Sequence, residues 1–209
     1  MQTEFSEKQL AIIPISAFTA SGNIEKLKTS LNEGLDAGLS INEVKEVLVQ
    51  LYAYAGFPRS LNGIGTLMSV VEERKQRGIE DDQGKDASPF PTDKTSLEFG
   101  TDNQTKLVGQ AVAGPMFDFC PEIDHFLKAH LFGDIFERDV LSWQDRELAT
   151  IAALANIDGV NSQLGSHIGI SLNNGINPTL LEQFIGSLRK HCGDDIADNA
   201  NQVLQNVLS

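Results

Sequence analysis

The sequence predicts an all-α protein, on three observations. Apolar residues recur at spacings of three and four over much of the chain, as at Leu27, Leu31 and Leu35, and this spacing is typical of amphipathic helices. Several of these stretches begin with a small polar residue followed, three positions later, by an acid or an amide, which is the pattern of a helix cap. Finally, the sequence contains no alternating apolar run bounded by hairpin turns, as a strand would require.

In the first part of the chain we expect helices over residues 5–19, 23–37, 40–56 and 59–77. Ser6 with Gln9, and Ser40 with Glu43, have the spacing of capping boxes. Pro14 should bend or break the first helix because it has no backbone N–H to donate.

Residues 78–102 are rich in Gly, Pro, Asp, Ser and Thr and show little periodicity, so we interpret them as a linker or a mobile lid. After them we expect a short helix over 103–112, one that starts at Pro121, two within 141–175 that are separated at Asp158-Gly159, and a last pair from Asn177-Pro178 to near Leu208. This interpretation divides the chain into a first unit (1–77), a connecting segment (78–102) and a second unit (103–209).

The composition excludes several classes of protein. The 209 residues carry a net charge of −13, which argues against binding to nucleic acids or to anionic membrane surfaces. No targeting segment and no apolar run long enough to span a bilayer is recognisable. Cys120 and Cys192 are the only cysteines and lie far apart, unlike a disulfide framework or a metal cluster. We therefore expect a soluble, cytoplasmic protein.

The chain also contains an internal repeat. Each copy consists of a buried helix, a glycine break, an amphipathic helix and a glycine cap, followed by a new capped helix. At a constant offset, Leu27, Leu31, Leu35, Gly38 and Leu39 correspond to Leu164, Ile168, Leu172, Gly175 and Ile176. A repeat of this length predicts two helical units packed about a pseudo-twofold axis.

Three stretches carry a resemblance to a known family: GLSINEVKEVLVQLYAYAGFPRSLNGI in the first copy, and LSWQDRELATIAALA and SHIGISLNNGIN in the second. They resemble the carboxymuconolactone decarboxylase family, which includes the AhpD alkylhydroperoxidases, in a tandem form. The resemblance covers most of residues 5–76 and 120–192. It implies an AhpD-like helical bundle, homo-oligomers, and pockets that lie between helices and near subunit contacts.

The peroxidase branch of this family has a signature of a Glu, a CxxC motif, and a His four residues after the second Cys. Glu147 and His167 match the Glu and the His, whereas Val160 and Gln163 occupy the cysteine positions. A thiol peroxidase needs a thiolate nucleophile and a resolving thiol, so CxxC-dependent peroxidase activity is not expected. In the first copy the four positions are filled by Gln9, Asn23, Lys26 and Ser30.

Glu147 and His167 are the candidate catalytic residues. A carboxylate bonded to an imidazole holds the ring and raises its basicity, which suits a general acid or base. Each residue also has a structural interpretation. His167 borders the apolar face of its helix and can be a core-edge imidazole, and Glu147 can be a first-turn acid that is favourable to the helix dipole.

Four further residues are candidates for substrate binding. Arg59 can bind a substrate carboxylate through two hydrogen bonds, or can be solvent-exposed. His130 can line the site, or can be structural. Tyr54 can present its hydroxyl to a pocket. Cys120, at a helix N-terminus, can be a reactive thiol or a small buried apolar residue.

These observations leave three hypotheses for function. The first is a decarboxylase-type lyase that acts on a small carboxylated lactone or related organic acid and needs no metal or organic cofactor. The second is an AhpD-like peroxidase activity that uses Cys120 or no thiol. The third is a non-catalytic, oligomeric binding protein, which the lack of a cavity between the helices of the second copy would favour.

Overall fold

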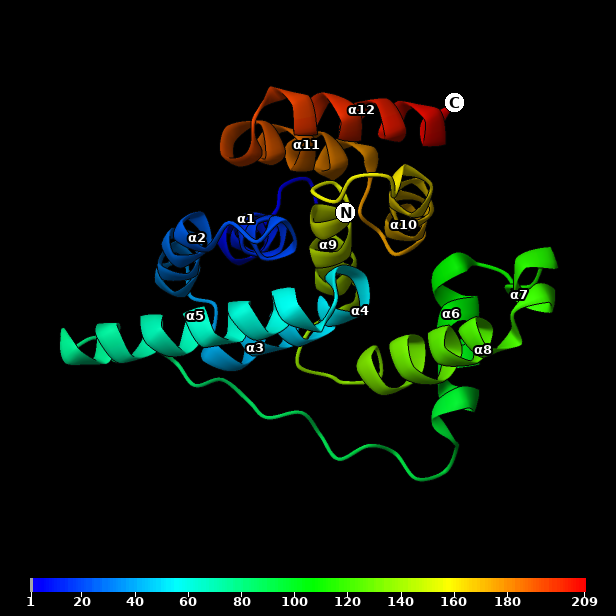
Figure 1. Cartoon of the computed structure of the whole chain (residues 1–209), viewed down its shortest axis with the longest axis horizontal. Coiled ribbons are helices and arrows are strands. Elements are labelled where there is room, and N and C mark those ends of the chain that lie inside the picture. The colour runs from blue at the N-terminus through cyan, green and yellow to red at the C-terminus, as the bar shows by residue number, and fades with distance from the viewer. Residues whose placement is uncertain (1) are drawn as a thin grey trace.

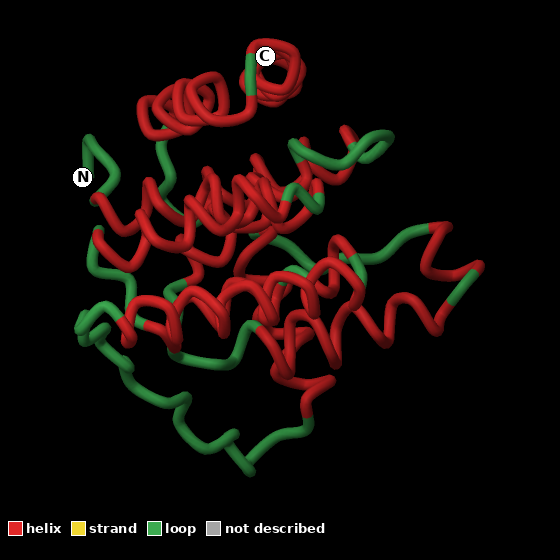
Figure 2. The backbone as a smooth tube through the Cα atoms, turned by 60° about the vertical axis from the view of Figure 1, so that its left-hand side comes forward, coloured by secondary structure: helices red, strands yellow, loops and turns green. Residues whose placement is uncertain are grey.

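The computed structural model describes residues 2–209, and all regular secondary structure in this range is helical, as predicted (Figures 1 and 2). The first part of the chain forms α1 (Glu7–Ser21), α2 (Ile24–Asp36), α3 (Ile41–Gln50), α4 (Tyr52–Ala55) and α5 (Phe57–Gln76). The middle forms α6 (Ser96–Val108), α7 (Pro115–Phe119), α8 (Pro121–His125) and the π-helical segment η1 (Phe126–Ile135). The last part forms α9 (Trp143–Leu154), α10 (Asn161–Asn173), α11 (Pro178–Cys192) and α12 (Asp194–Leu208).

Helix α1 runs through Pro14 without ending there, so the predicted break is wrong. Proline inside a helix costs roughly 3 kcal/mol. However, every residue from 12 to 20 is buried, including Ile12, Ile13, Ile15 and Phe18. Burial of each such side chain contributes about 1.5–3 kcal/mol. The packing of α1 therefore outweighs the lost backbone hydrogen bond.

Helix α6 begins at Ser96, seven residues before the predicted start at Asn103. Thr95 accepts a hydrogen bond from the backbone N–H of Glu98, and the Glu98 side chain accepts one from the backbone N–H of Thr95, which completes a capping box. The sequence signal was thus present, but it lies within a stretch that was interpreted as a linker. Within the predicted linker 78–102, only residues 78–95 lack helical structure.

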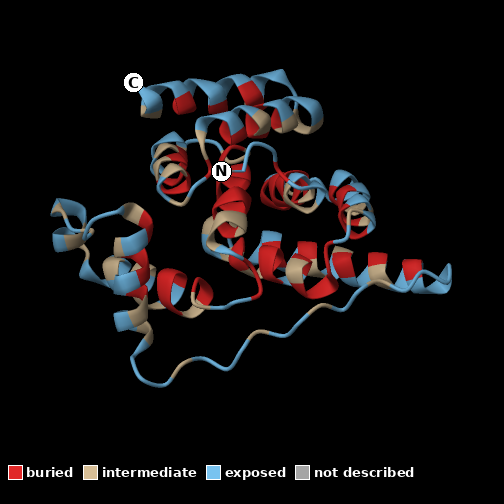
Figure 3. Cartoon of the chain, turned by 180° about the vertical axis from the view of Figure 1, so that it is seen from behind, coloured by how far each residue is buried: buried red, intermediate tan, exposed pale blue. Residues whose placement is uncertain are grey.

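The two main hydrophobic cores each contain side chains from both the first and the second part of the chain, and we call them the interlocked cores. One core is formed mainly by α9, α10, α11 and α12, but it includes Phe5 and Ile13 from the first part of the chain. The other is formed mainly by α1, α2, α3 and α5, but it includes Leu141, Ala149 and Ala153 from the second part. Figure 3, coloured by burial, shows α9 at the centre of the chain, and this helix is buried from Arg146 to Leu154.

A third core is smaller and consists of α6 and η1, which pack closely together. Gly100 of α6 and Gly133 of η1 allow this approach. A Cβ atom at Gly100 would lie 1.6 Å from the carbonyl oxygen of Lys128, and one at Gly133 would lie 2.3 Å from that of Ser96. Neither position has room for any other residue.

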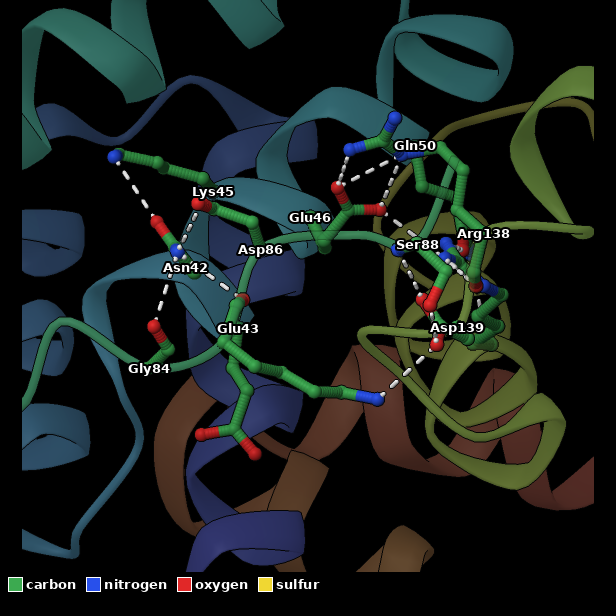
Figure 4. Close-up of polar contacts among 12 residues, drawn as sticks. Asn42, Glu43, Lys45, Glu46, Gln50, Gly84, Asp86, Ser88, Arg138 and Asp139 are labelled. Carbon is green, nitrogen blue, oxygen red and sulfur yellow. Dashed lines mark hydrogen bonds and ion pairs between the residues drawn. The ribbon is translucent and has the colours of Figure 1, made fainter. Parts of the chain in front are cut away.

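The segment between α5 and α6 is held by hydrogen bonds and an ion pair to both the first and the second part of the chain (Figure 4). At its start, Asp81 binds the buried guanidinium of Arg74. The backbone carbonyls of Asp82 and Gln83 then accept hydrogen bonds from the first two N–H groups of α3. Further along, Ser88 donates backbone and side-chain hydrogen bonds to the carboxylate of Asp139. We call residues 79–94 the strap.

Some helices of the two parts have similar lengths and similar caps. Helices α2 and α10 each have 13 residues, and α1 and α9 precede them. Gly38 and Gly175 follow α2 and α10 with left-handed φ angles of 91° and 88°. Ser40 and Asn177 then cap α3 and α11.

Candidate active site

Glu147 and His167 meet between α9 and α10. Glu147 lies in the second turn of α9, which Ser142 caps, and His167 lies in the middle of α10. The two helices form a hairpin in which the side-chain amide of Gln144 donates to the carbonyl of Asn174. This arrangement brings Glu147 Oε2 to 2.8 Å from His167 Nδ1.

The pair is almost completely enclosed. Glu147 is fully buried, and the side chain of His167 is 11% exposed. An ionised carboxylate can only accept hydrogen bonds, so the proton of this bond lies on Nδ1 of His167. Within residues 2–209 the other ring nitrogen, Nε2, makes no hydrogen bond, and it is the atom available to give or take a proton. The geometry is that of an imidazole oriented by a carboxylate.

Tyr54 contributes a third side chain, from the first part of the chain. Its ring lies edge-on to that of His167, with ring centroids 5.4 Å apart. Burial, and then the negative charge of Glu147, raise the pKa of the Tyr54 hydroxyl well above its ordinary value. The hydroxyl is therefore neutral and remains a hydrogen-bond donor near the pair.

Ser171 is a neighbour that the sequence reasoning missed. It is fully buried and follows His167 by one helical turn on α10. The spacing of four residues was visible in the sequence. A serine at this spacing is so common, however, that nothing marked it before the burial was known.

Arg146, next to Glu147 in the sequence, points the other way and forms an ion pair. Its buried guanidinium donates to Glu46 of α3, with Nη2 3.1 Å from Oε2, and to the side chain of Gln50. Arg138 binds the same carboxylate (Figure 4). Burial alone raises the pKa of Glu46, but the hydrogen bonds from Arg138 and Arg146 outweigh it, so this pKa is below its ordinary value.

The other candidates for substrate binding lie elsewhere in the described structure. Arg59 is exposed, and its guanidinium lies against Gly22 at the end of α1. His130 bonds to Asp134 and is 47% exposed. Cys120 is half-buried at the joint between α7 and α8. No hydrogen bond or ring contact among residues 2–209 joins any of the three to Glu147 or His167.

The two positions that carry cysteines in the peroxidase signature are not at a reactive centre. Val160 is half-buried against the core of the second part, and Gln163 is exposed. The remaining thiol, Cys192, packs against both main cores, and burial raises its pKa. A raised pKa disfavours the thiolate that peroxide reduction requires.

Three surface pockets are formed by other residues. One of about 400 Å³ lies between the N-terminal segment and α11, and is lined by Phe5, Leu10, Gln183 and His191 among others. One of about 270 Å³ lies between α3, the strap and Arg138. The third, of about 230 Å³, lies where the N-termini of α1, α3 and α9 meet. Neither Glu147 nor His167 lines any of these three pockets.

The fold and the site together define a class: a helical protein in which a hairpin of two helices buries a carboxylate against an imidazole. The model of the carboxymuconolactone decarboxylase family matches residues 121–206, a range that contains both site residues. The resemblance read from the sequence is therefore confirmed over this range, which is less than half of the chain. A comparison with curated proteins gives no match. In the described range, no helix is both long and apolar enough to cross a membrane.

Proposed function

We propose that the chain is a decarboxylase-type lyase that acts on a small carboxylated lactone or a related organic acid. The observation that carries the proposal is the contact of 2.8 Å between Glu147 and His167, inside the segment that the family model matches. The pair has the geometry of a general acid–base catalyst, and among residues 2–209 neither cysteine makes a hydrogen bond to it.

The chemistry divides between the two residues. Decarboxylation breaks the bond between the substrate carbon and its carboxylate, and the electron pair moves into a neighbouring carbonyl to form an enolate. His167, protonated on both nitrogens, donates the Nε2 proton to the carbon that lost CO₂. Glu147 stabilises the imidazolium before the transfer and holds the ring in place. Solvent then returns the proton to Nε2.

We also propose that the chain is a tandem form of the family, with residues 1–77 and 103–209 as two copies and 78–102 between them. The equal lengths of α2 and α10 and the matching glycines support this. The first copy lacks both site residues, so the second would carry the activity. Assembly into a homo-oligomer is part of the same proposal, because the family resemblance implies it.

The enclosure of the pair favours a second candidate, a non-catalytic binding protein that retains the fold. Glu147 is fully buried, and the three pockets described above lie away from it. An enzyme of this design would need to admit its substrate to this almost completely enclosed pair. A binding protein would not need to.

One experiment separates these candidates. Carboxymuconolactone is incubated with the protein, and the release of CO₂ is measured for the wild type and for His167→Ala. The lyase proposal expects release by the wild type and its loss in the variant, with the same oligomer in both. Release that persists in His167→Ala would remove the mechanism. No release from a panel of small carboxylated lactones would favour the binding protein.

A further inference from the structure

Three buried polar atoms around the Glu147–His167 pair have no hydrogen-bond partner among the described residues. They are Oε1 of Glu147, Oγ of Ser171 and the hydroxyl oxygen of Tyr54, which lies near the Thr150 side chain but makes no well-formed hydrogen bond to it. A buried polar group left without a partner costs about 1–3 kcal/mol. Such atoms are few in folded proteins, so a group of three at a candidate active site calls for a physical explanation.

The three atoms belong to one neighbourhood. Glu147 binds His167 directly, and the Tyr54 ring contacts the His167 ring. Helix α4, which carries Tyr54, contacts α9, which carries Glu147. Ser171 follows His167 by four residues on α10, so its side chain lies on the same face of that helix as the imidazole that binds Glu147.

The chemistry of the three atoms limits what can lie between them. Oε1 of the carboxylate only accepts hydrogen bonds, whereas the two hydroxyls can donate and accept. An anion would be repelled by the charge of Glu147. A neutral hydroxylic oxygen satisfies the whole set, because it donates to Oε1 and accepts from Tyr54 or Ser171.

We propose that Glu147, Tyr54 and Ser171 bind one hydroxylic oxygen, from water or from a neutral substrate hydroxyl. Tyr54 is thereby a positioning residue, which acts on His167 through this oxygen and Glu147. The first part of the chain thus completes a site whose acid–base pair lies in the second. The inference deepens the proposed function, since it concerns the same pair, but it does not depend on which reaction the pair performs.

The test uses the full chain and NMR of the proton on Nδ1 of His167, which reports the strength of its bond to Glu147. Tyr54→Phe and Ser171→Ala each weaken the binding of the oxygen that donates to Oε1. The carboxylate then attracts the Nδ1 proton more strongly, so the signal is expected to move downfield. Tyr52→Phe is the matched control, because Tyr52 lies on the same helix but stacks on Phe57. Circular dichroism verifies that each variant is folded.

A second arm identifies the source of the oxygen. Methanol serves as a small neutral hydroxyl probe. A shift of the Nδ1 signal on addition of methanol, present in Tyr52→Phe and absent in Tyr54→Phe, assigns the site to an organic hydroxyl. An effect of Tyr54→Phe that methanol does not alter assigns it to water. The inference is overturned when Tyr54→Phe and Tyr52→Phe give the same signal as the wild type. The NMR signal does not depend on turnover. It therefore tests this inference separately from the lyase proposal.

Discussion

Glu46 of α3 holds Arg146 of α9 through a buried ion pair, one residue before the candidate catalytic Glu147. The pair joins the two parts of the chain directly beside the site. It fixes which way α9 is rotated, because Arg146 must face α3 for its guanidinium to be neutralised. Glu147, the next residue around the helix, then faces α10 and His167.

Removal of one partner of this ion pair should be costly. Glu46→Gln leaves the guanidinium of Arg146 buried without a counter-charge, and such a change costs roughly 3–5 kcal/mol. Urea unfolding measures the loss of free energy of unfolding. The control is Asp102→Asn, which removes an acid from the exposed pair with Lys94 and should leave the free energy of unfolding nearly unchanged. Equal losses in the two variants would show that the buried pair does not stabilise the fold.

The acid–base pair should be required for turnover. His167→Ala and Glu147→Gln are expected to lower kcat by about 10²-fold or more, because each removes proton transfer or its orientation. His130→Ala is the matched control, since that histidine is exposed and bonded to Asp134. The readout is CO₂ release from carboxymuconolactone, and a similar loss in all three variants would point to a general effect on the fold.

The ionisation of Tyr54 should report the charge of Glu147. In a Tyr52→Phe background Tyr54 is the only tyrosine, because the chain has two. Burial and the charge of Glu147 raise its pKa. Glu147→Gln removes the second cause, so tyrosinate absorbance should appear at lower pH than in the background protein. An unchanged titration would show that the carboxylate and the phenol do not interact.

The contact between α6 and η1 should depend on Gly100. Gly100→Ala forces a methyl group into the carbonyl of Lys128, so this variant should lower the melting temperature and disorder the α6–η1 region. Gly65→Ala in α5 is the matched control. Nothing lies within 4 Å of a Cβ atom there, and it should stabilise by about 0.5–1 kcal/mol. Thermal unfolding compares the two, and a neutral Gly100→Ala would contradict the close packing.

The strap should be released when its anchor at Asp139 is lost. The hydrogen bonds from the backbone and side chain of Ser88 hold the pKa of Asp139 at about 2, below its ordinary value. A depressed folded-state pKa means that the anchor is present above the ordinary pKa and is lost as the pH falls towards about 2. Exchange of the Ser88 amide, corrected for its intrinsic pH dependence, should accelerate over this window.

The same anchor can be removed by mutation at neutral pH. Asp139→Ala should accelerate proteolytic cleavage within residues 79–94, because Ser88 and Lys85 both lose their partner. Asp93→Ala, within the strap itself, is the control and should leave the cleavage rate unchanged. Cleavage at the wild-type rate in Asp139→Ala would mean that other contacts hold this segment.

The helices and the contact between Glu147 and His167 could be predicted because they rest on local signals, whereas the catalytic role of the two residues stays a prediction. Caps such as Ser40–Glu43 and the family positions of Glu147 and His167 are readable in the chain itself. Three features were missed. The passage of α1 through Pro14 depends on tertiary burial. The start of α6 was concealed by its polar surroundings. The approach of Tyr54 to His167 joins residues that only the packing of α4 against α9 brings together.

The interlocked cores mean that the segment that matches the family is not a self-sufficient module. Phe5 and Ile13 fill its interior, and Leu141, Ala149 and Ala153 fill that of the other part. A fragment that begins at residue 121 would expose apolar surface and aggregate. A chain nicked once between the two anchors of the strap would instead stay together, since each piece would still carry the side chains that the other lacks.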